Sequence, residues 1–173
     1  MTDGEMPRRE RIPIASRPTA PETYGFPADL EGTLPWSHVE ERLLRAQNYW
    51  LATVRPDGRP HVTPVWGAWV DDTLYFDGLP TTRWGRNLAA NREIAFHLES
   101  GEDVVILEVT VEDVTTDGAT TERVVAAWNE KYGELAPEPA TRGVFRLRPR
   151  IVRAWSQYPK DVTRWTFEER RCD

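Results

Sequence analysis

The sequence is poor in the residues that build disulfides, metal centres and nucleophilic sites. Its single cysteine, Cys172, lies one residue from the end, so no internal disulfide can form and we expect a cytoplasmic protein. Its three histidines, His38, His61 and His97, are dispersed, and with one terminal cysteine they predict no metal site. The chain has no G-x-S-x-G motif and no familiar order of Ser, His and acidic residues, so nucleophilic catalysis is not indicated.

The sequence also lacks long apolar runs and an excess of basic residues. No run reaches the ~18 apolar residues that a membrane-spanning helix needs, and the N-terminus has no apolar core typical of a secretory signal. The formal charge of −6 argues against nucleic acid or an acidic membrane as partner, because both require a basic surface. At 173 residues the chain is most simply one domain that buries roughly 70% of its unfolded surface.

The most informative segment runs from Tyr49 to Asn87 and contains three successive strand patterns followed by a helix start. The triplet Pro56-Asp57-Gly58 predicts a tight hairpin turn, because glycine tolerates positive φ. A second hairpin is expected to turn at Asp71-Asp72. The segment therefore predicts a meander of antiparallel strands that leads directly into a helix.

The start of that helix has the features of a phosphate site. The order Thr81-Thr82-Arg83, with Arg86 one turn later, follows Pro80. A helix N-terminus offers unpaired N–H groups and the positive end of a dipole. A positive side chain there opposes the dipole and is locally unfavourable. An anion bound to Arg83 and Arg86 would offset this cost and would explain why arginines occur at the helix start. Together the features predict a β-barrel that holds a phosphorylated cofactor.

The first 33 residues differ in composition from the remainder. Residues 1–33 are rich in proline and charge, and we expect an extended arm, laid over a partner subunit, ahead of a domain over 34–173. Ser37 and Glu40 fit a capping box for the first helix. Val39, Leu43, Leu44 and Gln47 fall on one face of that helix.

Periodicity predicts a mainly β chain of at least six strands with two or three helices, arranged as a small antiparallel barrel. A break or an edge position is expected at Pro64, because proline cannot donate to a strand ladder. The expected strands are Tyr49–Arg55, His61–Val70, Thr73–Asp77, Glu93–Glu99, Val104–Val114, Val144–Leu147 and Ile151–Ser156. The expected helices are Thr81–Asn91 and one from a cap at Asp117 to Tyr132, ended by Gly133 before a proline-rich loop over Glu134–Thr141.

Eight tryptophans are many for this length. Large aromatic side chains dominate cores and interfaces, and they also pack against flat ligands or a second subunit. For any one tryptophan, a place in the barrel core is the simpler explanation.

Four segments carry a resemblance to a known family: LATVRPDGRPHVTPVW, LYFDGLPTTRWGRNLAANREIAFHLE, DVVILEV and YPKDVTRWTF. From Pro35 to the C-terminus the chain resembles the pyridoxamine 5′-phosphate oxidase-like proteins, and within them the flavin and deazaflavin oxidoreductases. The resemblance implies a mainly β fold, an antiparallel split β-barrel of six to seven strands that binds a flavin. It also implies a homodimer with two cofactors in clefts between the subunits.

The resemblance places the cofactor on particular residues. One group would line the isoalloxazine ring, a second would close the cleft, and a third would hold the phosphate and the ribityl oxygens. These groups are, in that order, Thr63, Pro64, Val65 and Trp66; Phe76 and Asp77; and Thr82, Arg83, Arg86 and Asn87. Trp165 would lie near the ring in the partner's site. Trp84 stands where many relatives have lysine, and Arg83 beside it would supply the missing charge.

The leading hypothesis is an oxidoreductase that transfers hydride between the bound ring and a flat conjugated small molecule, flanked by Trp66, Trp84 or Trp165. Such chemistry needs no side-chain catalyst, because the cofactor performs it. The cofactor is FMN or the deazaflavin coenzyme F-420, whose acidic tail would require a basic exit such as Arg55 and Arg59. The alternatives are a non-catalytic binding protein for a flavin, haem or bilin, and a dimeric structural partner without a cofactor.

Overall fold

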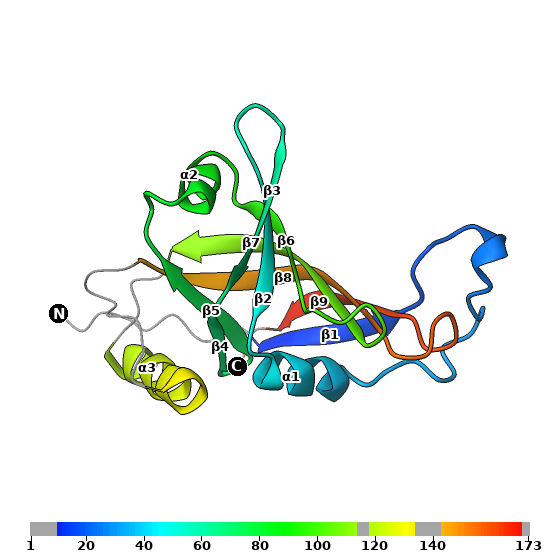
Figure 1. Cartoon of the computed structure of the whole chain (residues 1–173). Coiled ribbons are helices and arrows are strands. Elements are labelled where there is room, and N and C mark those ends of the chain that lie inside the picture. The colour runs from blue at the N-terminus through cyan, green and yellow to red at the C-terminus, as the bar shows by residue number, and fades with distance from the viewer. Residues whose placement is uncertain (1–9, 114–117, 134–142, 171–173) are drawn as a thin grey trace.

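A computed structural model describes residues 10–113, 118–133 and 143–170, which form a nine-stranded sheet and three α-helices (Figure 1). Every strand pairing is antiparallel. The strands are β1 Glu10–Ser16, β2 Tyr49–Val54, β3 Pro60–Val65, β4 Gly67–Val70, β5 Thr73–Gly78, β6 Glu93–His97, β7 Val104–Asp113, β8 Gly143–Trp155 and β9 Thr163–Arg170. The helices are α1 Trp36–Arg45, α2 Arg83–Ala90 and α3 Gly118–Tyr132, with a 3-10 turn, η1, at Glu22–Tyr24.

The long strand β8 splits the barrel. The main path of the sheet is β1-β9-β8-β7-β6-β2-β3, and β7 follows β8 along most of its length. On its other edge, β8 pairs with β5 through residues 143–147 and with β9 through residues 152–154. One strand therefore belongs to two half-barrels, and β3 and β1 are left as the terminal strands of the path. The mainly β, antiparallel split-barrel class expected from the sequence is confirmed.

Aromatic rings fill the barrel between the two halves. The fully buried ring of Phe76 lies 5.1 Å from that of Phe145, 5.6 Å from Trp84 and 6.0 Å from Phe96, measured between centroids. A second buried cluster joins α3 to β4 and β5 through Val124 and Trp128. The helices cover opposite ends of the sheet, with α2 at one end and α1 and α3 at the other (Figure 1).

The described residues contain more strands than the six to seven expected. Residues 10–16, inside the segment predicted to be an extended arm, form β1 and pair with β9 of the same chain. Pro13 is tolerated there because β1 lies at the edge of the sheet, where a missing donor breaks fewer ladder bonds. The arm's contact with a partner subunit and the domain boundary at residue 33 stay predictions.

The expected capping box at the first helix is wrong. The N-cap of helix α1 is Pro35, two residues before Ser37; it makes no side-chain cap hydrogen bond, and the helix begins at Trp36. Ser37 and Glu40 therefore lie inside the helix, where they cannot cap it reciprocally. The expected apolar face is correct for Val39 and Leu43, which are buried, but Leu44 is 58% exposed. Gln47 lies beyond the end of α1.

The expected turns and breaks are mostly confirmed. Gly58 has φ of 84°, and Gly133, with φ of 71°, ends α3. Pro64 lies in β3, an edge strand that stops at Val65. The expected division near Pro149 is wrong, because β8 continues through it with a register shift opposite Glu108 and Val109. The predicted cap at Asp117 and the whole of the Glu134–Thr141 loop lie outside the described residues.

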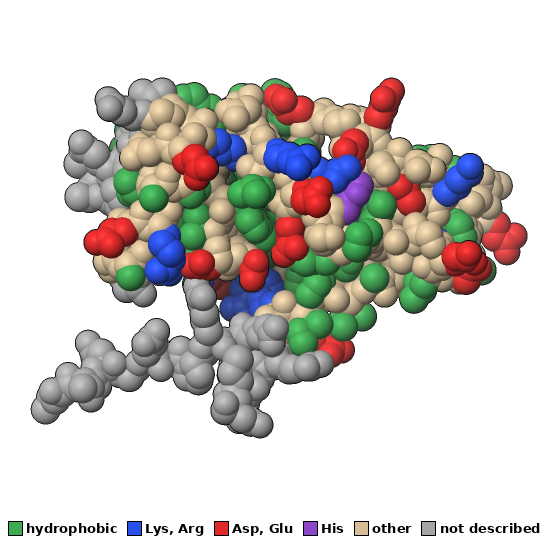
Figure 2. Space-filling view, turned by 90° about the horizontal axis from the view of Figure 1, so that it is seen from below, with side chains coloured by type: hydrophobic (Ala, Val, Ile, Leu, Met, Phe, Trp, Pro, Cys, Tyr) green, Lys and Arg blue, Asp and Glu red, His purple; other side chains and the backbone are tan. Residues whose placement is uncertain are grey.

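The surface mixes charge and apolar area. On the face seen in Figure 2, acidic, basic and hydrophobic side chains are interspersed, and no single sign of charge covers the face. Among the described residues, no helix has both the length and the apolar character required to cross a membrane.

The β4–β5 turn provides a test of backbone strain. Asp71 and Asp72 both have positive φ, 49° and 58°, and Asp71 is paired with Arg123 Nε at 2.9 Å. Asp72→Gly removes the steric cost of this conformation, and we expect the free energy of unfolding to rise by about 0.5–1 kcal/mol in chemical denaturation. Asp71→Gly, the matched control, also loses the Arg123 pair and should gain less. A less stable Asp72→Gly protein would contradict this reading of the turn.

Candidate functional site

Two glycines allow the N-terminal end of α2 to pack closely against the barrel. A Cβ added at Gly85 would lie 2.7 Å from the carbonyl oxygens of Leu79 and Pro80, so α2 rests directly on the backbone that precedes it. A Cβ at Gly78 would lie 2.1 Å from the Trp84 indole. That indole is 8% exposed and packs on Phe145. The helix start is therefore fixed in place, and Trp84 anchors it from within the core.

A buried polar chain ties α2 to the β2–β3 hairpin. Asn87 is fully buried, and its Nδ2 donates to Thr53 Oγ1 at 2.8 Å. The Thr53 hydroxyl in turn lies 3.5 Å from His61 Nδ1 and 3.3 Å from the His61 carbonyl oxygen. Thr53 and His61 are directly opposite in the β2–β3 register, so both side chains are on the face toward α2. The chain of contacts places the hairpin beside the helix start.

Cationic side chains gather at this junction. Burial, followed by the nearby charges of Arg55 and Arg83, lowers the pKa of His61. Hydrogen bonds from Arg59 lower the pKa of Asp57, and the charges of Arg55 and Arg83 lower it further. Arg55 from the hairpin and Arg83 from α2 thus act on the same two groups. The positive potential at the junction comes from two elements that lie far apart in the sequence.

The donors at the junction fit an anion. The Nε of Arg55 is buried and has no hydrogen-bond partner among the described residues. The exposed Arg83 side chain makes no hydrogen bond or ion pair within the part of the chain that the structure describes. The only carboxylate among these groups, Asp57, is occupied by Arg59 at 2.6 Å. Unpaired guanidinium groups beside a helix N-terminus are suited to a phosphate, which can accept from them bidentately.

The other predicted phosphate residues are engaged within the protein. Thr82 caps α2: its Oγ1 accepts from Gly85 N at 3.0 Å and donates to the Leu79 carbonyl at 2.9 Å. Arg86 folds back and donates to the Thr81 carbonyl. Thr82 therefore contributes by shaping the helix start, and its hydroxyl hydrogen is already used. Asn87 has no exposed surface and acts on the site through Thr53.

The predicted ring-lining residues follow the edge strand β3 away from the junction. Thr63 is half-buried, Pro64 is exposed and Val65 is 9% exposed. Trp66, directly after the strand, is 41% exposed, and its ring stacks on Tyr132 at 4.7 Å with an interplanar angle of 7°. The stack presents a flat aromatic surface at the end of β3 opposite to the hairpin turn.

Three other aromatic predictions meet a different environment. The Phe76 side chain is in the core, so only its backbone can contribute to a cleft, whereas Asp77 is half-buried beside it on β5. Trp165 is 1% exposed and packs edge-on against Trp36 at 5.7 Å. Both indoles fill the barrel, so their burial does not support the expected contacts of Trp165 with a partner's ring, or of Trp84 or Trp165 with a substrate, and these contacts stay predictions.

Sequence reasoning underestimated Arg55 and His61. The sequence predicts for Arg55 at most the guidance of an acidic tail, and it singles out His61 only as one of three dispersed histidines that form no metal site. The strand register carried the missing signal, because a tight Pro56-Asp57-Gly58 turn places His61 opposite Thr53 on the inner face. What the sequence could not indicate was the contact between this face and α2.

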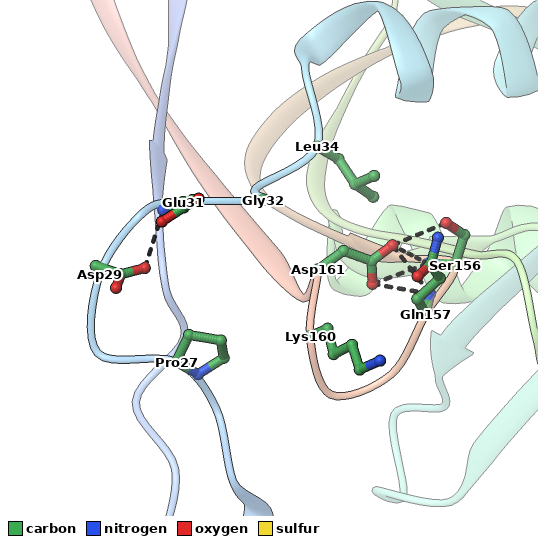
Figure 3. A pocket seen from close by; sticks show the side chains of 9 residues that line it. All are labelled: Pro27, Asp29, Glu31, Gly32, Leu34, Ser156, Gln157, Lys160 and Asp161. Atoms are coloured by element: carbon green, nitrogen blue, oxygen red, sulfur yellow. Dashed lines mark hydrogen bonds between the residues drawn. The ribbon is translucent and has the colours of Figure 1, made fainter.

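A described cavity lies away from the cationic junction. It has a volume of about 470 Å³ and is lined by residues of the N-terminal segment and of the loop after β8 (Figure 3). Within it, Asp161 accepts from the backbone N–H groups of Ser156 and Gln157 and from the Ser156 hydroxyl. Burial would raise the pKa of Asp161, but these hydrogen bonds outweigh it and hold the pKa below its usual range. Asp161 is thus a loop-capping carboxylate, not part of the cationic junction.

The described residues contain no group of three or more His, Cys, Asp and Glu side chains placed to hold a metal ion.

Comparison with known proteins bears on this site. A family model described as pyridoxamine 5′-phosphate oxidase matches residues 36–156, which include α2, the hairpin and β3. Comparison with curated proteins finds no match.

Solved structures share the fold. An F-420 reductase is 31% identical, with a TM-score of 0.51, and the match covers 68% of this chain and 96% of that one. A conserved hypothetical protein from Mycobacterium tuberculosis is 25% identical, with a TM-score of 0.60, covering 75% and 88%. A haem storage protein from Vibrio cholerae is 22% identical, with a TM-score of 0.54, covering 68% and 90%, a likeness that shows the fold alone.

The cationic junction makes a prediction for His61. Because the Arg83 charge disfavours the imidazolium form, Arg83→Ala should raise the pKa of His61, as measured by NMR titration of its ring protons. Arg45→Ala, which removes an arginine from the end of α1, is the matched control and should leave that pKa unchanged. An unaltered His61 titration in Arg83→Ala would show that the two groups do not share one junction.

Proposed function

The chain belongs to the pyridoxamine 5′-phosphate oxidase family, and on this premise we propose that it is a flavin- or deazaflavin-dependent oxidoreductase. Its substrate would be a flat, conjugated small molecule that exchanges hydride with the bound ring. The observation that carries the proposal is the convergence of Arg55, His61 and Arg83 at the N-terminus of α2. FMN and the deazaflavin coenzyme F-420 both have the phosphate that such a junction would bind.

The length of β3 matches an elongated cofactor. His61 and Trp66 are five positions apart in the sequence, which corresponds to roughly 17 Å along a strand. A phosphate at the junction would thus leave the ring beside Thr63, Pro64 and Val65. As an edge strand, β3 leaves alternate backbone N–H and C=O groups without ladder partners, so they can bind the polar edge of a ring.

The residues of the chain would bind and orient, and the bound ring would supply the hydride chemistry. Backbone N–H groups near Thr63–Val65 would stabilise charge that develops at the ring's pyrimidine edge. Trp66, with Tyr132 stacked on it, offers the exposed aromatic surface on which a flat substrate can lie. No side chain of the described site needs to act as a nucleophile.

The choice between the two cofactors depends on opposing observations. Similarity to an F-420 reductase at 31% identity supports the deazaflavin. The net charge of −6 and the pairing of Arg59 with Asp57 leave little positive surface for an acidic tail, which supports FMN. The second candidate function, a binding protein for a flavin, haem or bilin, has the support of the shared fold of a haem storage protein.

We also propose that the chain forms a homodimer through the outer face of β2, β3 and β6. Tyr49, Leu51 and Thr53 point inward, so Trp50, Ala52 and Val54 point outward. Their neighbours across the strands are Pro64, Val62 and Pro60 on β3 and His97 and Ala95 on β6. Val54 is 42% and Val62 52% exposed, which is typical of a sheet face that a second subunit covers. A cytoplasmic location stays a prediction.

Cofactor titration tests the function. We expect FMN or F-420 to quench tryptophan fluorescence saturably, and Arg83→Ala to weaken that binding by roughly 1.5–3 kcal/mol through loss of a charge-assisted hydrogen bond. Arg45→Ala is the control that keeps the affinity. If neither cofactor binds and haem or biliverdin does, the binding-protein alternative replaces the oxidoreductase. If Arg83→Ala binds as well as the wild type, Arg83 does not hold the phosphate.

The dimer has its own test. Val62→Asp places a charge at the centre of the apolar face, and we expect the dimer dissociation constant to rise roughly 100-fold in sedimentation experiments. Leu44→Asp, a matched change at an exposed leucine on α1, should leave the association unaltered. Equal effects of the two substitutions would assign the interface to another surface.

A further inference from the structure

We propose that Lys131 is a reactive amine that binds small aldehydes covalently and reversibly as an imine. Lys131 lies near the end of α3, half-buried, at the end of β3 opposite to the cationic junction. The site needs no cofactor, so it stands apart from the proposed oxidoreductase function. Its support comes from the walls around the amine, from its hydrogen bonds and from the composition of the chain.

Aromatic rings and backbone surround the amine. The Nζ of Lys131 lies 4.7 Å from the centroid of the Tyr49 ring and 5.5 Å from that of Tyr132. The elements around it are α1, β2, β4 and α3 itself. The titratable groups that they direct toward the amine are the Tyr49 and Tyr132 hydroxyls. Among the described residues, no carboxylate pairs with Lys131.

The hydrogen bonds fit a neutral amine. Nζ donates to Tyr49 Oη at 2.7 Å and to the Gly67 carbonyl at 3.3 Å. The Tyr49 hydroxyl donates to the Leu43 carbonyl, so its oxygen is an acceptor for the lysine. A neutral amine has two N–H groups for these two acceptors and keeps a lone pair, whereas an ammonium has a third N–H without a described partner.

Burial shifts the amine toward that form. Desolvation lowers the pKa of Lys131 to about 8 from 10.5, although the ring faces favour the charged form. At pH 7 about a tenth of such an amine is neutral, compared with about three in ten thousand for an unshifted lysine. Desolvation in an apolar setting is an established way to make a lysine nucleophilic.

Lysine is rare in this chain, which bears on the half-buried position of Lys131. The chain has 22 Lys and Arg residues, and only Lys131 and Lys160 are lysines. Arginine cannot lose its proton in a protein. The chain therefore places one of its two lysines in a half-buried setting, whereas Lys160 is exposed on the loop after β8.

The surroundings favour an aldehyde as the reacting group. The lone pair attacks the carbonyl carbon, water leaves with the former carbonyl oxygen, and the product is a C=N bond on Nζ. Atoms balance without an oxidant or a reductant. A neutral imine suits a site without a counter-ion, whereas a carbamate from carbon dioxide would leave an unpaired anion beside the rings. The Tyr49 hydroxyl lies 2.7 Å from Nζ and would donate to the imine nitrogen only by turning its hydrogen away from the Leu43 carbonyl.

Reductive trapping tests the proposal. The full-length protein is incubated with propanal and cyanoborohydride at pH 7, and alkylation of Lys131, Lys160 and the N-terminal amine is followed by peptide mass spectrometry. We expect Lys131 to react roughly tenfold faster than Lys160, with a rate midpoint near pH 8, and the ratio to fall toward pH 9.5. Equal rates, a slower Lys131 at both pH values or a midpoint near 10 would overturn the proposal.

Two matched variants test which amine is responsible for the fast phase of alkylation. Lys131→Arg should abolish it, and Lys160→Arg should keep it, while alkylation of the N-terminal amine stays the same in both. A fast phase that survives Lys131→Arg would place the reactive amine elsewhere. Site-resolved rates in the wild-type protein decide the matter even if a variant does not fold.

Discussion

The hydrogen bond between Asn87 and Thr53 is the constraint on which the candidate site depends. It crosses from α2 to β2 in a fully buried setting, where an unmade polar contact is costly. The Thr53 hydroxyl also contacts the His61 carbonyl oxygen across the hairpin. The hairpin therefore cannot move away from α2 without breaking the hydrogen bond between Asn87 and Thr53. The same helix is held in place by two further features: Gly85 allows close contact with the preceding backbone, and the Trp84 indole is packed in the core. The cationic junction exists because these contacts bring two separate segments together.

Much of the fold could be predicted from local patterns. The alternation in β2 and β6, the Pro56-Asp57-Gly58 turn and the stop at Gly133 each follow from a few adjacent residues. The parts that failed depend on distant partners. The sequence of β1, in a proline-rich segment, is no obvious strand until β9 pairs with it. Pro149 does not end β8, because β8 accommodates a register shift at Arg150, opposite Glu108 and Val109. The start of α1 at Trp36 was missed because a Ser-x-x-Glu pattern is easily matched by chance.

The candidate site divides in the same way. Arg83 could be identified as a candidate because a positive residue at a helix start is locally unfavourable, whereas Arg86 donates to the Thr81 carbonyl. Burial could not be foreseen, and it decides which tryptophans can meet a ligand: Trp66 is exposed, whereas Trp84 and Trp165 fill the barrel. Arg55 and His61 join the site only through the tertiary contact of the hairpin with α2. Sequence thus indicates the chemistry of the phosphate end, and only packing indicates its full set of donors.

The surroundings of the two ends of β3 differ in how they affect positive charge, and this difference would orient a ligand bound along the strand. At the hairpin end, guanidinium groups stay charged under all ordinary conditions, and Arg55 and Arg83 have no described carboxylate partner. At the other end, Lys131 lies among Tyr49, Tyr132 and backbone carbonyls, and burial disfavours its charge. The hairpin end therefore offers an anion two guanidinium groups, whereas the other end offers one amine whose charge burial disfavours, and a flat uncharged ring is accommodated better near Trp66. A cofactor with a phosphate at one end and an aromatic system at the other would bind along β3 in a single orientation, because the reverse would remove the phosphate from its donors and desolvate it beside aromatic rings.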